Sequence, residues 1–225
     1  MELRGSVDKK ILFEKKLEKL QNKLLQMGGL VQEAIAKAVQ SLKEQDTSLA
    51  AEVVREDDLI DRLELEIEEG CLALIATQQP MAKDLRKVAT LFKMIVDLER
   101  MADYATDIAR IVCRIGQEPL IKPLMDIPRM AEITQRMVKE ALDAYIRENV
   151  ELAMKMVQED DGVDKLHKQV FRELLTIMME NPRTITQATH LLFVSRYLER
   201  IADHATNIGE EVLFLVTGEK KALNK

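Results

Sequence analysis

One eleven-residue segment of this chain occurs twice, a hundred positions apart, and this repeat limits the possible folds more than any other feature. The first copy is LERMADYATDI, from Leu98 to Ile108, and the second is LERIADHATNI, from Leu198 to Ile208. Eight of the eleven positions are identical, and neither copy contains Gly or Pro. Both copies are therefore expected to lie in long helices, within a chain made of two similar helical units.

The composition agrees with a helical protein and argues against several other classes. The 225 residues include only 8 Gly and 5 Pro, and aromatic residues make up 4%, which disfavours a β-sandwich or barrel. A net charge of −6 gives no electrostatic basis for binding nucleic acid. No apolar signal segment and no run of the ~18 apolar residues typical of a membrane span is visible. The two cysteines, Cys71 and Cys113, are far apart and fit a reducing compartment, so we expect a cytoplasmic protein without membrane insertion.

Breaks in the hydrophobic periodicity divide the chain into six helical segments. We predict helices at about residues 7–44, 47–77, 81–115, 131–147, 150–180 and 183–216. Gln79-Pro80 and Asn181-Pro182 break the pattern, and residues 116–128 hold a Gly and three of the five prolines, which is typical of a linker. The predicted fold is all-α, with two tandem pseudo-symmetric three-helix bundles of long antiparallel helices, at residues 1–117 and 118–225.

Acidic residues on the second and third predicted helices of the first unit are expected to meet. Antiparallel helices that turn at Pro80 place Asp61 level with Glu99, and Asp57 level with Asp103, because the members of each pair lie equally far from the turn. Residues four apart on a helix share one face. Like charges at this spacing destabilise a helix by a few tenths of a kcal/mol, so a bound cation would relieve the arrangement.

The second unit repeats this arrangement around its own turn, between Asn181 and Pro182. Asp164 is level with Glu199, and Asp160 with Asp203. Carboxylates without cysteine or a repeated histidine suit hard cations such as Mg²⁺, Mn²⁺, Ca²⁺ or iron. The candidate metal ligands, all on the bundle surface between two helices, are Asp57, Asp61, Glu99, Asp103, Asp107, Asp160, Asp164, Glu199, Asp203 and Asn207. Asp107 and Asn207 are peripheral because apolar residues occupy the facing level.

One alternative to metal binding by these residues stays open. The acidic residues could be ordinary surface charge, balanced by nearby basic residues such as Arg62, Arg100, Lys165 and Arg200. His167 and His204 lie beside the clusters, but Glu64 and Tyr104 occupy their repeat positions. Because a histidine ligand would be expected in both units, we predict that these two side chains are solvated or partly packed.

The LERMADYATDI and LERIADHATNI segments resemble the duplicated E-x-x-x-D motif of the PhoU family of phosphate-uptake regulators. Residues 83–88 and 179–185 resemble the same family, and the resemblance covers almost the whole chain. It implies a cytoplasmic homodimer that restrains the phosphate regulon. It also implies two partners, a sensor histidine kinase of the phosphate regulon and the ATPase of the phosphate ABC transporter. The implied cofactors are divalent or trivalent metal ions, with a multinuclear iron cluster as one form and Mn, Mg and Zn as alternatives.

From these patterns we expect a non-enzymatic negative regulator of phosphate uptake and phosphate-regulon signalling, with a metal-binding acidic cluster on each bundle. The alternative is a carboxylate-bridged metalloenzyme, an oxidase or a phosphohydrolase, that uses the same clusters. An enzyme of this kind needs an open coordination position, a pocket that excludes water and usually an acid or base beside the metal. The lack of a repeated histidine and the expected surface position of the clusters argue against it.

Overall fold

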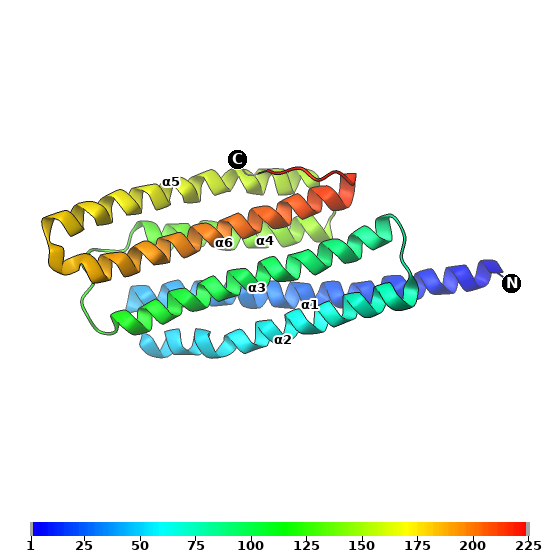
Figure 1. The fold of residues 1–225 in the computed structure, drawn as a ribbon, viewed down its shortest axis with the longest axis horizontal. Coiled ribbons are helices and arrows are strands. Elements are labelled where there is room, and N and C mark those ends of the chain that lie inside the picture. Colours follow the sequence, from blue (N-terminus) through cyan, green and yellow to red (C-terminus); the bar gives the residue numbers. More distant parts are fainter. Residues whose placement is uncertain (1, 224–225) are drawn as a thin grey trace.

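A computed structural model describes residues 2–223 and consists of six long helices. Their bounds are α1 (Glu2–Glu44), α2 (Thr47–Gln78), α3 (Lys83–Ile115), α4 (Asp126–Ile146), α5 (Val150–Glu180) and α6 (Ile185–Thr217), with a 3₁₀ turn, η1 (Pro182–Thr184), before α6. Helices α1 to α3 form one antiparallel three-helix unit, and α4 to α6 form a second (Figure 1). This arrangement confirms the predicted all-α fold, whereas the division into domains at residue 117 stays a prediction.

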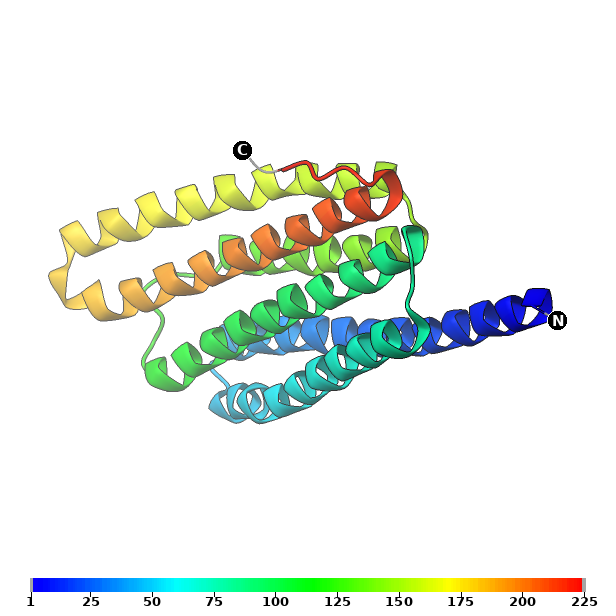
Figure 2. The same ribbon diagram turned by 45° about the vertical axis from the view of Figure 1, so that its right-hand side comes forward.

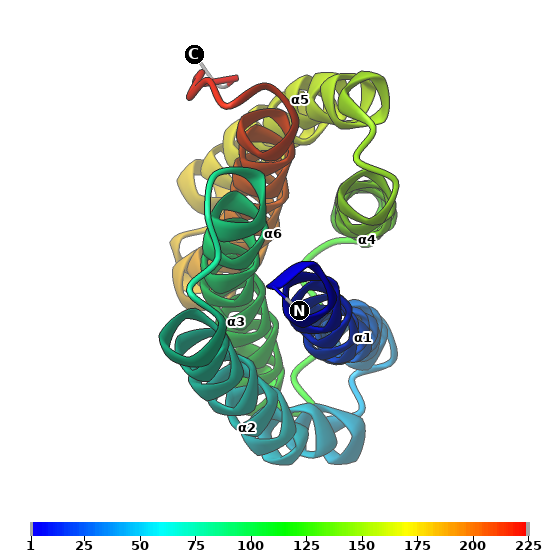
Figure 3. The same ribbon diagram turned by 90° about the vertical axis from the view of Figure 1, so that its right-hand side faces the viewer.

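The helices are arranged in two layers, which are clearest in the view along the bundle (Figure 3). Helices α2, α3, α6 and α5 form a curved layer, and α1 and α4 lie against one side of it. The two units meet mainly where α3 packs antiparallel to α6, with α1 against α4 beside them. Leu98 and Leu198, from the repeated segments, are fully buried in the continuous core that results. The repeats therefore lie at the centre of the molecule.

Local signals in the sequence explain where most helices begin and end. Asp46 caps α2, because its side chain accepts hydrogen bonds from the backbone N–H groups of Ser48 and Leu49. The predicted start of α4 is wrong, since α4 begins at Asp126 instead of about residue 131. Pro128 lies in the first turn of this helix, where a missing N–H removes no hydrogen bond. This proline begins a helix rather than ending a linker.

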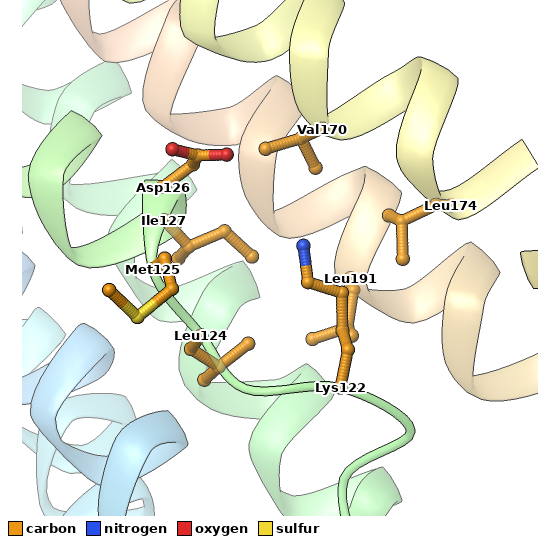
Figure 4. A pocket seen from close by; sticks show the side chains of 8 residues that line it. All are labelled: Lys122, Leu124, Met125, Asp126, Ile127, Val170, Leu174 and Leu191. Carbon is orange, nitrogen blue, oxygen red and sulfur yellow. The ribbon is translucent and has the colours of Figure 1, made fainter.

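The linker between the two units is fixed against the second unit. The backbone N–H of Ile121 donates to the side chain of Gln187 at 2.6 Å, and the Gln187 amide donates to the carbonyl of Pro119 at 3.0 Å. Lys122 pairs with Glu173 on α5 and lines a cavity of about 10 Å³, which has room for about one water molecule (Figure 4). The linker is thus a structured crossing between the two bundles.

None of the helices in residues 2–223 has an apolar stretch long enough to cross a bilayer.

Candidate metal-binding seams

The acidic residues lie along two seams on the helical layer. The first seam consists of Asp57 and Asp61 on α2 with Glu99 and Asp103 on α3, and the second of Asp160 and Asp164 on α5 with Glu199 and Asp203 on α6. Leu98 and Ala102 belong to the buried stripe of α3, so the residues that follow them turn by about 100° toward the edge facing α2. The α3 carboxylates are therefore partly exposed, at 20% for Glu99 and 43% for Asp103.

The carboxylates of the first seam are close enough to perturb one another. Burial, and next the charge of Asp103, raises the pKa of Glu99 to about 7, and Asp61 adds to the effect. Burial, and then the charge of Asp61, raises the pKa of Asp57, on which Asp103 also acts. Both helix-to-helix pairs that the spacing predicts are therefore neighbours in space. Crowded carboxylates of this kind favour a proton or a cation.

The second seam buries carboxylate oxygens that have no hydrogen-bond donor among the described residues. Burial, followed by the charges of Asp203, Asp164 and Glu199, raises the pKa of Asp160 to about 7. One oxygen of Asp160, Oδ1, and one of Glu199, Oε2, are buried and accept no hydrogen bond from any residue that the structure describes. A buried acceptor without a donor costs roughly 1–3 kcal/mol. Two such oxygens in an all-carboxylate site have the chemistry that a hard cation requires.

Several of these carboxylates pair with a basic side chain of their own helix. Arg100 Nη1 lies 3.1 Å from Asp103 Oδ2, and Arg200 Nη1 lies 3.4 Å from the equivalent oxygen of Asp203. Among the side chains that the structure describes, those of residues 9–223, no three acidic, histidine or cysteine side chains are close enough together to hold a metal ion. The seams thus offer donors of a suitable type, with two unpartnered oxygens, and the donors would have to move together to share one ion.

The two residues predicted as peripheral ligands have other partners. Asp107 pairs with Arg110 at 2.9 Å and lines a groove between α3 and α6. The amide of Asn207 donates to Asp97 Oδ1 at 3.0 Å, across the interface between the two units, and His204 Nδ1 lies 2.8 Å from the same oxygen. Sequence reasoning missed Asp97, because its repeat position holds a tyrosine and gives no acidic signal.

His167 is partly packed, as predicted, but it lies beside the second seam. The Ser195 hydroxyl donates to the carbonyl of Leu192 at 2.9 Å, so the His167 Nδ1 at 3.0 Å must carry the proton and donate to Ser195 Oγ. Burial, and then the charge of Arg196, lowers the pKa of His167. This neutral imidazole lines a groove of about 510 Å³ together with Asp164 and Glu199.

Comparisons with known proteins give a consistent result over both units. A family model described as "PhoU domain" matches residues 24–112 and again residues 127–212. A phosphate-specific transport system accessory protein PhoU homolog from Aquifex aeolicus is 44% identical over 205 residues, which cover 91% of this chain and 93% of the relative. The homolog of the same name from Clostridium acetobutylicum is 40% identical over 214 residues, which cover 95% of this chain and 98% of the relative.

Solved structures agree with these sequence relatives. The crystal structure of PhoU from Pseudomonas aeruginosa has a TM-score of 0.88 at 39% identity, covering 92% of this chain and 100% of that one. The crystal structure of the phosphate transport system regulatory protein PhoU from Streptococcus pneumoniae has a TM-score of 0.87 at 29% identity, covering 93% of this chain and 99% of that one.

Proposed function

Because the chain belongs to the PhoU family, we propose that it is a negative regulator of phosphate uptake and of phosphate-regulon signalling that catalyses no reaction itself. The observation that carries this proposal is the match of both units, over nearly the whole chain, to proteins named as accessory proteins of phosphate-specific transport. Nothing in the names of the relatives points to the metalloenzyme alternative. The proposed setting is the cytoplasm, and the proposed form is a homodimer.

The proposed partners are the ATPase of the phosphate transporter and the sensor histidine kinase of the phosphate regulon. Long helical faces with exposed apolar side chains support docking by surface contact. On α2, Leu65 and Leu72 are 55% and 54% exposed, and on α5, Phe171 and Leu175 are 45% and 46% exposed. Large apolar side chains that recur on an outer helical face are typical of surfaces that bind another protein.

A reporter strain tests the regulatory proposal directly. In a bacterium that lacks its own family member, the chain should restore repression of a phosphate-regulon reporter in high phosphate. The Leu65→Glu/Leu72→Glu double variant should lose both this repression and co-purification with the transporter ATPase, while remaining folded by circular dichroism. Unchanged reporter expression together with no recovery of either partner would contradict the proposal.

We also propose that metal ions bind at the two seams and hold α2 to α3 and α5 to α6. The buried, unpartnered oxygens of Asp160 and Glu199 support this role, and the all-oxygen donor set favours iron, Mn²⁺ or Mg²⁺ over Zn²⁺. A multinuclear iron cluster at each seam is the first candidate, held by the four carboxylates of that seam. The metal would supply positive charge there, which relieves the repulsion that raises the pKa values of Glu99 and Asp160.

Elemental analysis of untagged protein, purified without chelator, tests the metal proposal separately from the regulatory one. We expect more than one equivalent of metal per chain, which Asp103→Asn/Asp203→Asn should remove. Asp58→Asn/Asp161→Asn is the matched control, because these two acids are also repeated but are exposed to solvent. Metal-free wild-type protein, or equal metal loss in both double variants, would refute metal binding at the seams and leave the regulatory proposal standing.

A further inference from the structure

A groove of about 460 Å³ lies between α3 and α6, apart from both seams, at the end where α3 finishes and α6 begins. It falls within the range of about 300–1,000 Å³ that is typical of small-molecule sites. Helix α3 lines it with two arginines, and α6 lines it with hydroxyl and aromatic side chains. Neither the accessory role nor the proposed metal sites account for this groove.

The α3 wall of the groove carries the positive charge. Arg110 and Arg114 are four residues apart, so their guanidinium groups extend from the same face of the helix. Arg110 is oriented by its ion pair with Asp107, whereas Arg114 forms no ion pair or hydrogen bond with any residue in the described part of the chain. The planar donors of a guanidinium group match the oxygens of a phosphate group better than an ammonium does.

The α6 wall of the groove carries a row of aromatic rings. The ring of Phe193 is stacked with that of Tyr197, with 6.1 Å between centroids and 27° between planes. Tyr197 is stacked in turn with Tyr104 on α3, at 5.6 Å and 25°. Phe193 ends this row and is 48% exposed, so a flat apolar surface faces the groove. A planar base can stack on such a surface, as bases stack on exposed aromatic side chains in proteins that bind single-stranded nucleic acid.

The opposite end of the α3–α6 contact is built from the equivalent positions, and there the chain covers the aromatic ring with its own cations. Lys93 is the repeat position of Phe193, and Phe214 is that of Arg114. The ring of Phe214 is covered by the ammonium groups of Lys93 and Lys220, which lie 5.9 and 5.5 Å from its centroid. The segment after α6, residues 218–223, folds back over this end (Figure 2), where the N–H of Leu223 donates to the side chain of Glu210 at 2.7 Å.

The two ends thus share one combination, a cation from α3 with an aromatic ring from α6, and only the end with Arg114 and Phe193 is left open. We propose that this open groove binds a nucleoside mono- or diphosphate. The phosphate lies on Arg114 and Arg110, and the base stacks on Phe193. With two arginines and one carboxylate, the groove suits one or two phosphate groups rather than three. This inference goes beyond the proposed function and rests on none of the seam residues.

Calorimetric titration of the full chain with AMP, with GMP and with inorganic phosphate tests the proposal. Chelator is included so that the carboxylate seams cannot bind the ligand through a metal. We expect saturable binding of AMP or GMP, weakened at least tenfold by Arg114→Gln and by Phe193→Ala. Inorganic phosphate should bind at least tenfold more weakly than the better nucleotide.

Matched controls separate the groove from general charge and aromatic effects. Lys220→Gln removes a positive charge at the closed end, and Phe171→Ala removes a similarly exposed ring on α5, so both should leave the affinity unchanged. The absence of saturation by either nucleotide would overturn the proposal, as would equal affinity in Arg114→Gln. Phosphate that binds as tightly as the nucleotides, with no effect of Phe193→Ala, would overturn the assignment to a nucleoside.

Discussion

At the scale of single residues, the second seam is where charge and burial conflict most strongly. Burial and three neighbouring carboxylates raise the pKa of Asp160 to about 7, so at pH 8 the metal-free protein holds an unfavourable negative charge there. Asp160→Asn should therefore stabilise the metal-free protein at pH 8 by roughly 1–2 kcal/mol, allowing for solvent screening of this half-buried group. Urea unfolding in chelator measures this gain, and Asp161→Asn, an exposed neighbour, should show none.

The same carboxyl groups set the direction of the pH dependence. An ordinary carboxyl group in the unfolded chain has a pKa of about 4, whereas burial and neighbouring charges raise the pKa of Glu99 and of Asp160 to about 7 in the folded protein. Between these values the folded state binds more protons than the unfolded state, so the free energy of unfolding falls as the pH rises. The advantage of Asp160→Asn should accordingly be small at pH 4 and full at pH 8. An advantage that is equal at both pH values would contradict this assignment.

Among the candidate ligands, the sequence predicts proximity only for residues on two consecutive antiparallel helices joined by a short turn. The rise of a helix per residue is constant and the turns are short, so distance from the turn predicts that Asp57 lies near Asp103. Asn207 lay beyond this reasoning, because its hydrogen bond to Asp97 depends on how the two units pack together. Side chains from both units determine that packing, so the pattern of residues within one unit does not predict it.

At the scale of a helix, two adjacent glycines in α1 have different surroundings. A Cβ atom on Gly28 would overlap the buried Leu142 side chain of α4, whereas a Cβ on Gly29 would meet nothing within 4 Å. Gly29→Ala should therefore stabilise the protein by about 0.5–1 kcal/mol, since alanine favours the helix. Gly28→Ala should destabilise it by about 1–3 kcal/mol, because Leu142 must repack. Thermal unfolding of the two variants measures both signs, and equal effects would contradict the close approach of α1 and α4.

The helices themselves were the most predictable part of the fold. Apolar residues at steps of three and four gave a continuous helix through Gly28 and Gly29, and α1 is continuous there. The start of α4 was missed because Pro128 can either end a linker or begin a helix, and the local pattern does not distinguish the two. The first turn of α4 contains few apolar residues. It forms a helix because its tertiary contacts, such as those of Ile127 in the core, stabilise it.

At the scale of the whole molecule, the two units depend on each other. Helix α3 has fifteen buried residues where α2 has seven, because α3 packs on both units. Residues 118–225 expressed alone would expose the face of α6 that α3 covers. We therefore expect this half to self-associate or aggregate, and to recover a defined 1:1 species when residues 1–117 are co-expressed. Size-exclusion chromatography with light scattering measures both outcomes, and a stable monomeric half with cooperative unfolding would contradict the shared core.

The difference between the two ends of the α3–α6 contact has a topological origin. In a tandem duplicate, the segment that follows the first unit must continue to the second, whereas the segment that follows the second is free to fold back. Residues 218–223 fold back over Glu210, while the equivalent segment after α3 is the linker, which crosses to Gln187 and leads into α4. Joining two copies of one unit therefore adds to the differences between their side chains a difference in how the two ends are covered. The fusion itself leaves the groove at one end of the α3–α6 contact uncovered, and this groove, with one wall from each unit, is a surface that neither unit has alone.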